Sequence, residues 1–142
     1  MEHGYSATMK LEHAKEMALK WKARPGSEWF LIDVKKADRA FSEWTKGYVK
    51  RGEYPKEKRG SRKQIEEFFA SHKPDEVLSP SVVFVERQGQ YPMLIFRQGR
   101  MRFCVLRDAG VDKMYVSGMY PSRQIAKESG ILIEDNKEKD NG

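Results

Sequence analysis

The sequence predicts an α+β domain, because strand-like and helix-like segments follow one another along the chain. The clearest strands are two apolar, β-branched and aromatic runs at 81–86 and 91–96. The turn residues 87–90 join these runs, a pattern typical of a β-hairpin. Apolar residues at helical spacing occur before and after the hairpin, most clearly at 7–23. A chain of 142 residues suits one domain with a sizeable core.

In the first half of the chain, the sequence predicts helices around one buried strand. Residues 7–23 place Met, Ala and Trp side chains on one helical face. Residues 28–34 are mainly apolar on both faces of a strand, as an inner strand of a sheet would be. A helix is expected within 36–49. Another begins at Ser61, where the spacing to Gln64 forms a capping box.

After the hairpin, the sequence predicts a short connection and then a helix. Residues 97–102 form the connection, and residues 103–109 form the helix, which ends at Gly110. The remaining predicted elements are a strand at 113–116, a helix from Ser122 to Lys127 or Glu128, and a strand at 131–133.

Composition indicates the kind of partner and the compartment. A net charge of +6 and a pI near 9.4 favour a polyanion such as nucleic acid, or an anionic small ligand. The single cysteine, Cys104, excludes an intramolecular disulfide and a cysteine-based metal cluster, and we expect it to be a small buried hydrophobe. No apolar run approaches the ~20 residues of a membrane span, so we expect a cytoplasmic protein without a membrane segment.

The connection at 97–102 is a candidate phosphate site. A strand that leads into a helix start presents free backbone N–H groups at the positive end of the helix dipole. Gly99 would let the backbone approach a ligand closely, and Arg100 and Arg102 would add donors suited to phosphate. The other interpretation, a solvated connection without a ligand, stays open.

A second basic feature occupies residues 46–63, where Tyr48 and Tyr54 lie among the charges. Basic side chains follow a phosphate backbone, and aromatic rings stack on bases. A solvated surface loop is the alternative interpretation. The residues predicted to contact nucleic acid are Lys50, Arg51, Lys56, Lys58, Arg59, Arg62 and Lys63.

The order of these features resembles the ParB/sulfiredoxin-like superfamily, which includes ParB-like nuclease domains. The resemblance covers 29–116 and includes Ile-Asp-Val at 32–34, the helix begun by Ser61, the strand after Pro80, and Gly99-Arg100-Met101-Arg102 before Phe103. It implies a mixed sheet surrounded by helices, over residues 29–133. An extra helical extension at 1–28 and a disordered polar tail at 134–142 would flank this domain.

The resemblance also implies a ligand. In members of the superfamily the loop and the following helix start hold nucleotide phosphates, so the cofactor would be a nucleotide, CTP or ATP, with Mg²⁺. Gly99 would be the glycine of closest approach, and Arg102 the arginine that meets phosphate. Met101 stands where many members have His, and a thioether cannot accept a proton. Strong catalysis is therefore not expected, and the sequence assigns neither a catalytic residue nor a metal site.

The sequence alone leaves three candidate functions. The favoured one is a binding module for nucleic acid or a nucleotide phosphate. The second is a nuclease or a nucleotide-dependent phosphotransferase, which would need converging carboxylates. The third is a phage or plasmid protein-interaction factor that inhibits a host system. Acidic candidates for the enzyme are Asp33, Asp38, Glu66, Glu67 and Asp108, of which the adjacent Glu66 and Glu67 are expected at the surface.

Overall fold

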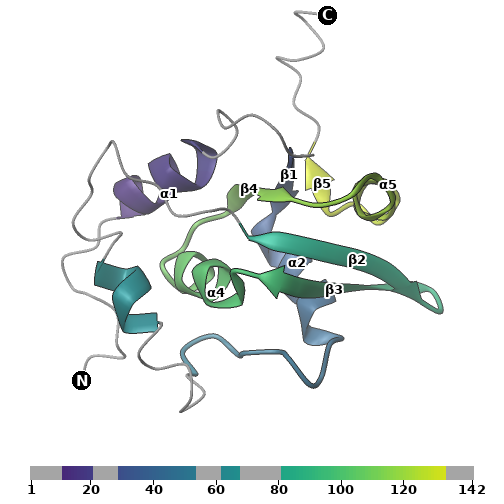
Figure 1. Cartoon of the computed structure of the whole chain (residues 1–142), viewed down its shortest axis with the longest axis horizontal. Coiled ribbons are helices and arrows are strands. Elements are labelled where there is room, and N and C mark those ends of the chain that lie inside the picture. Colours follow the sequence, from purple (N-terminus) through teal and green to yellow (C-terminus); the bar gives the residue numbers. More distant parts are fainter. Residues whose placement is uncertain (1–10, 21–28, 54–61, 68–80, 134–142) are drawn as a thin grey trace, which may run out of the picture.

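The computed structural model describes residues 11–20, 29–53, 62–67 and 81–133 (Figure 1). These residues form a five-stranded sheet in the order β3-β2-β4-β1-β5. The β2–β4 pair is parallel and the other pairs are antiparallel, so the sheet is mixed. Helices pack on this sheet, and the predicted α+β class is confirmed. The strands are β1 (Trp29–Asp33), β2 (Val82–Gln88), β3 (Tyr91–Gln98), β4 (Lys113–Ser117) and β5 (Leu132–Ile133).

Strand β1 is an inner strand, as its apolar faces predicted. It pairs with β4 on one side and with β5 on the other. Its end differs from the prediction, because Val34 already belongs to helix α2 (Val34–Ser42). The Asp33 carboxylate accepts a hydrogen bond from the Lys36 amide at 3.0 Å, which caps α2 two residues earlier than expected. The helix ends at Ser42, inside the range 36–49 where a helix was expected.

The predicted hairpin is confirmed. Strands β2 and β3 pair from Val82 to the turn, where Gln88 lies opposite Tyr91. The two-residue turn contains Gly89 at φ 64°, in the left-handed region that tight hairpin turns use. Figure 1 shows this turn at one end of the hairpin and helix α4 (Arg100–Asp108) at the other end.

The connection between β3 and α4 is shorter than predicted. Only Gly99 separates the two elements, so residues 100–102 form the first turn of the helix. The prediction of a helix start at 103 was therefore wrong by one turn. Arg100 and Arg102 are polar, and the single apolar residue between them, Met101, is too little to extend the apolar periodicity, which explains the late assignment.

Helix α5 (Tyr120–Glu128) also begins earlier than predicted, with Pro121 in its first turn. Ser122, the expected cap, has a different role. Its Oγ accepts a hydrogen bond from the buried amide of Val85 at 3.0 Å. Strand β2 is paired with β4 at Val82 and Ser117, and Val85 lies beyond that point, so a hydroxyl takes the place of a strand partner.

The core joins helices from both halves of the chain to the sheet. Helix α1 (Leu11–Lys20) lies within the predicted 7–23 and packs on β4 through buried Ala14, Met17 and Ala18. The Phe41 ring of α2 meets Phe96 of β3 at 4.9 Å between centroids, in an edge-on arrangement. The proposed cap Ser61, the cations Lys56, Lys58 and Arg59, and the tail at 134–142 lie outside the described residues.

None of the helices in the described ranges combines the length and the apolar character needed to cross a membrane.

Candidate functional site

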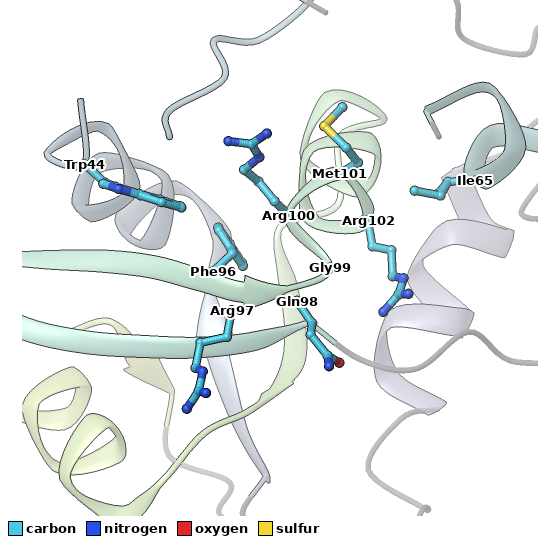
Figure 2. Close-up of a pocket in the computed structure, with 9 residues that line it drawn as sticks. All are labelled: Trp44, Ile65, Phe96, Arg97, Gln98, Gly99, Arg100, Met101 and Arg102. Carbon is cyan, nitrogen blue, oxygen red and sulfur yellow. The ribbon is translucent and has the colours of Figure 1, made fainter. Parts of the chain in front are cut away.

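A pocket of about 340 Å³ opens where β3 passes into α4 (Figure 2). It contains all three residues that the sequence assigned to phosphate. The pocket is lined by Trp44, Ile65, Phe96, Arg97, Gln98, Gly99, Arg100, Met101 and Arg102.

The backbone at the base of this pocket is the uncapped start of α4. Gly99 is the N-cap residue, in the left-handed region at φ 77° and ψ 25°, and it has no side chain to bond the amides above it. The first helical hydrogen bond runs from the Phe103 amide to the Gly99 carbonyl at 3.1 Å. An α-helix leaves the amides before that bond without intrahelical acceptors, so the N–H groups of residues 100–102 form a positive helix end.

Gly99 is required by its neighbour Ser81. A Cβ at position 99 would lie 2.8 Å from Ser81 Cα and 2.9 Å from Ser81 Oγ. The Ser81 hydroxyl donates to the Gly99 carbonyl at 2.8 Å and holds the two segments together. This packing, together with the positive φ, accounts for the glycine without a ligand. The close approach that the sequence suggested is therefore made by Ser81.

The two arginines of the motif flank the helix start from different sides. Arg100 Nη1 donates to the Gly47 carbonyl at 2.9 Å, which fixes its guanidinium near the turn after α2. Figure 2 shows Arg100 on the same side of Gly99 as Trp44, and Arg97 and Arg102 on the other side. Arg102 folds back so that its Nη1 lies 3.3 Å from the position that a Cβ on Gly99 would take. The guanidinium groups therefore surround the helix start without meeting at one point.

Two side chains beside the site contribute to the core. Met101 is buried, so this position between the two arginines holds an apolar packing residue. Cys104 is fully buried within α4, as predicted. Burial raises the pKa of its thiol to about 11, which keeps the thiol protonated and unreactive at neutral pH.

Trp44 is the site residue that sequence reasoning missed. It lies in the range 36–49 where a helix was expected, but it follows the end of α2 and is only half-buried. Gly47 packs on the ring, since a Cβ at Gly47 would lie 2.5 Å from three of its carbons. The indole thus forms a wall of the pocket. The spacing from Trp44 to Gly47 in a turn could have indicated this packing.

The basic side chains of the segment 46–63 that the structure describes do not form one surface. Lys50, Arg51 and Lys63 are exposed, and Arg51 lines a different cavity from the one at Gly99. Arg62 was expected at the surface, but it is 1% exposed, and that expectation is corrected. Its Nη2 donates to Asp108 Oδ2 at 2.9 Å, and its Nε lies 3.3 Å from Glu66 Oε2.

Glu66 is corrected as well, because it is 2% exposed and lies against Arg62 rather than in solvent. Burial raises the pKa of its carboxyl, and the Arg62 charge opposes this shift. Burial also raises the pKa of Asp108 to about 6, so this carboxylate remains ionised at neutral pH beside Arg62 and Arg107.

Two of the other acidic candidates have structural partners, and the third is exposed. Asp33 caps α2, and Asp38 accepts hydrogen bonds from Arg107 at 2.9 Å and from the Tyr48 hydroxyl at 3.2 Å. Glu67 is exposed. No acidic side chain is among the described residues that line the pocket. Within the described ranges, no group of three or more His, Cys, Asp or Glu side chains is placed to hold a metal ion.

Comparisons of the chain with protein-family models, with curated proteins and with solved structures found no match.

Proposed function

We propose that this chain is a binding module of the ParB/sulfiredoxin-like type that holds the phosphate of a nucleic acid or a nucleotide at the start of α4. One observation carries the proposal. An uncapped helix start opens into a pocket whose wall contains Arg97, Arg100 and Arg102.

The chemistry of the pocket favours an anion. Backbone N–H groups at a helix start and the helix dipole both stabilise negative charge. Arginine adds planar, permanently charged donors that match phosphate oxygens. The net charge of +6 would draw a polyanion to the protein from a distance.

The pocket also favours a ligand with a base attached to its phosphate. Trp44 offers an indole ring beside the helix start, and stacking of a base on an aromatic ring contributes about 1–3 kcal/mol. A volume of about 340 Å³ lies within the usual range for small-ligand sites, roughly 300–1,000 Å³. An unpaired nucleotide, either free or within a single strand, would satisfy both features. CTP and ATP are its small-molecule forms, and their phosphates would bring Mg²⁺.

The proposal is limited to binding. Met101 cannot move a proton. Four of the acidic candidates, Asp33, Asp38, Glu66 and Asp108, are engaged elsewhere in the fold, and the exposed Glu67 does not line the pocket. We therefore keep the nuclease or phosphotransferase and the inhibitor of a host system as unfavoured alternatives.

The proposal is tested by fluorescence anisotropy with a labelled single-stranded oligonucleotide, at salt concentrations between 50 and 200 mM. We expect the logarithm of the binding constant to fall with the logarithm of the salt concentration, by ~0.7 for each phosphate contact. Arg100→Ala should weaken binding by roughly tenfold, because it removes one charge-assisted hydrogen bond.

Arg87→Ala is the matched control for this experiment. Arg87 is an exposed arginine near the hairpin turn, where it pairs with Glu128 at 2.8 Å. Its loss should leave the affinity nearly unchanged. Equal losses in the two variants, or binding that does not depend on salt, would contradict a phosphate site at α4.

A further inference from the structure

We infer a second site, for a small oxyanion, at the C-terminal end of α4. A cavity of about 320 Å³ lies there, and three cationic side chains line it: Lys35 of α2, Arg51 and Arg107. Two carboxylates, Asp38 and Asp112, also line it. This cavity is distinct from the pocket at Gly99, and the inference does not depend on the function proposed above.

The central feature is a buried guanidinium with an unused donor. Arg107 is 1% exposed, and its Nε donates to Asp108 Oδ1 at 2.8 Å. Its Nη1 donates to Asp38 Oδ1 at 2.9 Å and to the Val49 carbonyl at 2.6 Å. Its Nη2 is buried and has no hydrogen-bond partner in the described part of the chain. A buried charged donor without an acceptor is unusual, and water or an ion commonly satisfies such a group.

The charges around the cavity favour an anion. Among the lining side chains, three cations against two carboxylates leave an excess of one positive charge; Asp108, which shares its charge between Arg107 and Arg62, is not among them. The charge of Asp38 is already matched by Arg107, and the Tyr48 hydroxyl also donates to Asp38. Lys35 and Arg51 are exposed, so their flexible side chains can reach toward an oxyanion at the mouth of the cavity.

The negative end of α4 does not offset this excess. The Gly110 amide donates to the Arg107 carbonyl, and the Val111 amide donates to the Leu106 carbonyl, both at 3.0 Å. With Gly110 at φ 99°, these two bonds form a Schellman motif that occupies terminal carbonyls of the helix. A metal cation would therefore find few free oxygens from the helix.

The wall of the cavity is fixed in advance. The Val34 amide donates to the Asp112 carbonyl at 2.9 Å, which ties the start of α2 to the turn after α4. Arg107 is held by two hydrogen bonds to other segments, at Asp38 and the Val49 carbonyl, and by one to Asp108 in its own helix. An oxyanion would thus enter a preformed site, and little ordering of the protein would oppose binding.

The ligand chemistry is that of an oxyanion of low charge, either a phosphate group or a carboxylate. Both accept hydrogen bonds from a guanidinium edge, and both match a site with an excess of one positive charge. Helix α4 has nine residues, so a rise of 1.5 Å per residue separates the two sites by ~13 Å. Ligands at the two ends are therefore distinguishable by residue-specific spectra.

The test is a titration of the ¹⁵N-labelled full chain, followed by NMR, with sodium phosphate in one arm and sodium acetate in another. Sodium chloride at matched ionic strength is the reference. We expect saturable shifts of the amide signals of Lys35, Arg51, Gly110 and Asp112 in at least one arm. Saturation with phosphate alone assigns a phosphate group, and saturation with acetate alone assigns a carboxylate.

Arg51→Ala should raise the dissociation constant at least fivefold, because it removes a cation from the mouth of the cavity. Arg39→Ala is the matched control, since Arg39 is an exposed arginine of α2 that lines another cavity. Shifts that match those in sodium chloride, or an affinity that Arg51→Ala leaves unchanged, would overturn the inference.

Discussion

Gly99 lies where the backbone leaves β3 and enters α4, and two constraints act on this residue. Its φ of 77° is in the left-handed region, which costs about 1–2 kcal/mol for residues with a Cβ. Its Cα also faces Ser81 so closely that a Cβ would lie 2.8 Å from the Ser81 backbone. The residue that begins the candidate site therefore also holds the sheet to the helix.

Gly99→Ala should lower the free energy of unfolding by about 2–4 kcal/mol, from left-handed strain and from overpacking against Ser81. Gly89→Ala is the matched control, because Gly89 has φ 64° and no atom within 4 Å of its Cβ position. Gly89→Ala should lower the free energy of unfolding by about 1–2 kcal/mol, from left-handed strain alone. Urea denaturation of both variants measures the difference. Equal losses would show that Ser81 yields to the new methyl group.

Because of Cys104, the free energy of unfolding should depend on pH in the alkaline range. Burial raises the pKa of this thiol from 9.0 in its ordinary environment to about 11. Above pH 9 the unfolded chain releases the thiol proton while the native protein keeps it, so stability is lost as the pH rises from 9 toward 11. The loss from this group should reach about 1 kcal/mol at pH 10.

The measurement is the free energy of unfolding between pH 8 and pH 10.5, for the wild type and for Cys104→Ala. At pH 8 the variant should be less stable than the wild type, because the substitution leaves a small cavity. Its free energy of unfolding should fall less steeply as the pH rises. Parallel curves would contradict a native thiol that stays protonated.

At the scale of elements, the helical segment at 62–67 is attached to α4 through buried charges. Arg62 and Arg107 both bond the carboxylate of Asp108, whose side chain is 0% exposed. The Gly52 amide donates to the same carboxylate at 3.2 Å, which adds the turn after Val49 to the assembly. One acidic side chain thus joins three segments that are distant in the sequence.

Asp108→Ala should lower the free energy of unfolding by about 3–5 kcal/mol, because it leaves two buried guanidinium groups without their shared partner. Asp112→Ala, four residues later and exposed, should change it by less than about 0.5 kcal/mol. Thermal or urea unfolding measures both. A small effect at Asp108 would mean that water reaches these arginines in the native protein.

The elements that the sequence could predict are those with local causes. The hairpin follows from apolar runs around a glycine turn, and β1 follows from its two apolar faces. The start of α4 was misplaced, because Met101 stands between two arginines and one apolar residue does not make a helical period. The burial of Arg62 depends on Asp108, which is 46 residues away, and a single sequence does not reveal such a partner. Trp44 belongs to the candidate site because the fold places it beside β3, which its position in the sequence did not indicate.

At the scale of the whole molecule, positive charge gathers at both ends of one helix. Arg97, Arg100 and Arg102 surround the start of α4, whereas Arg51 and Arg107 lie near its end. The sequence placed its basic residues in two features, the connection at 97–102 and the segment 46–63. In the described part of that segment, Arg51 faces the second cavity and Arg62 is buried. A net charge of +6 can still draw a polyanion to both sites.

The most direct test of the central claim is a crystal structure of the chain with a short single-stranded oligonucleotide. The account predicts a phosphate oxygen about 3 Å from the amides of residues 100–102, with Arg100 close to it and a base on the Trp44 ring. Phosphates bound elsewhere on the surface, with those amides in contact with water alone, would contradict it.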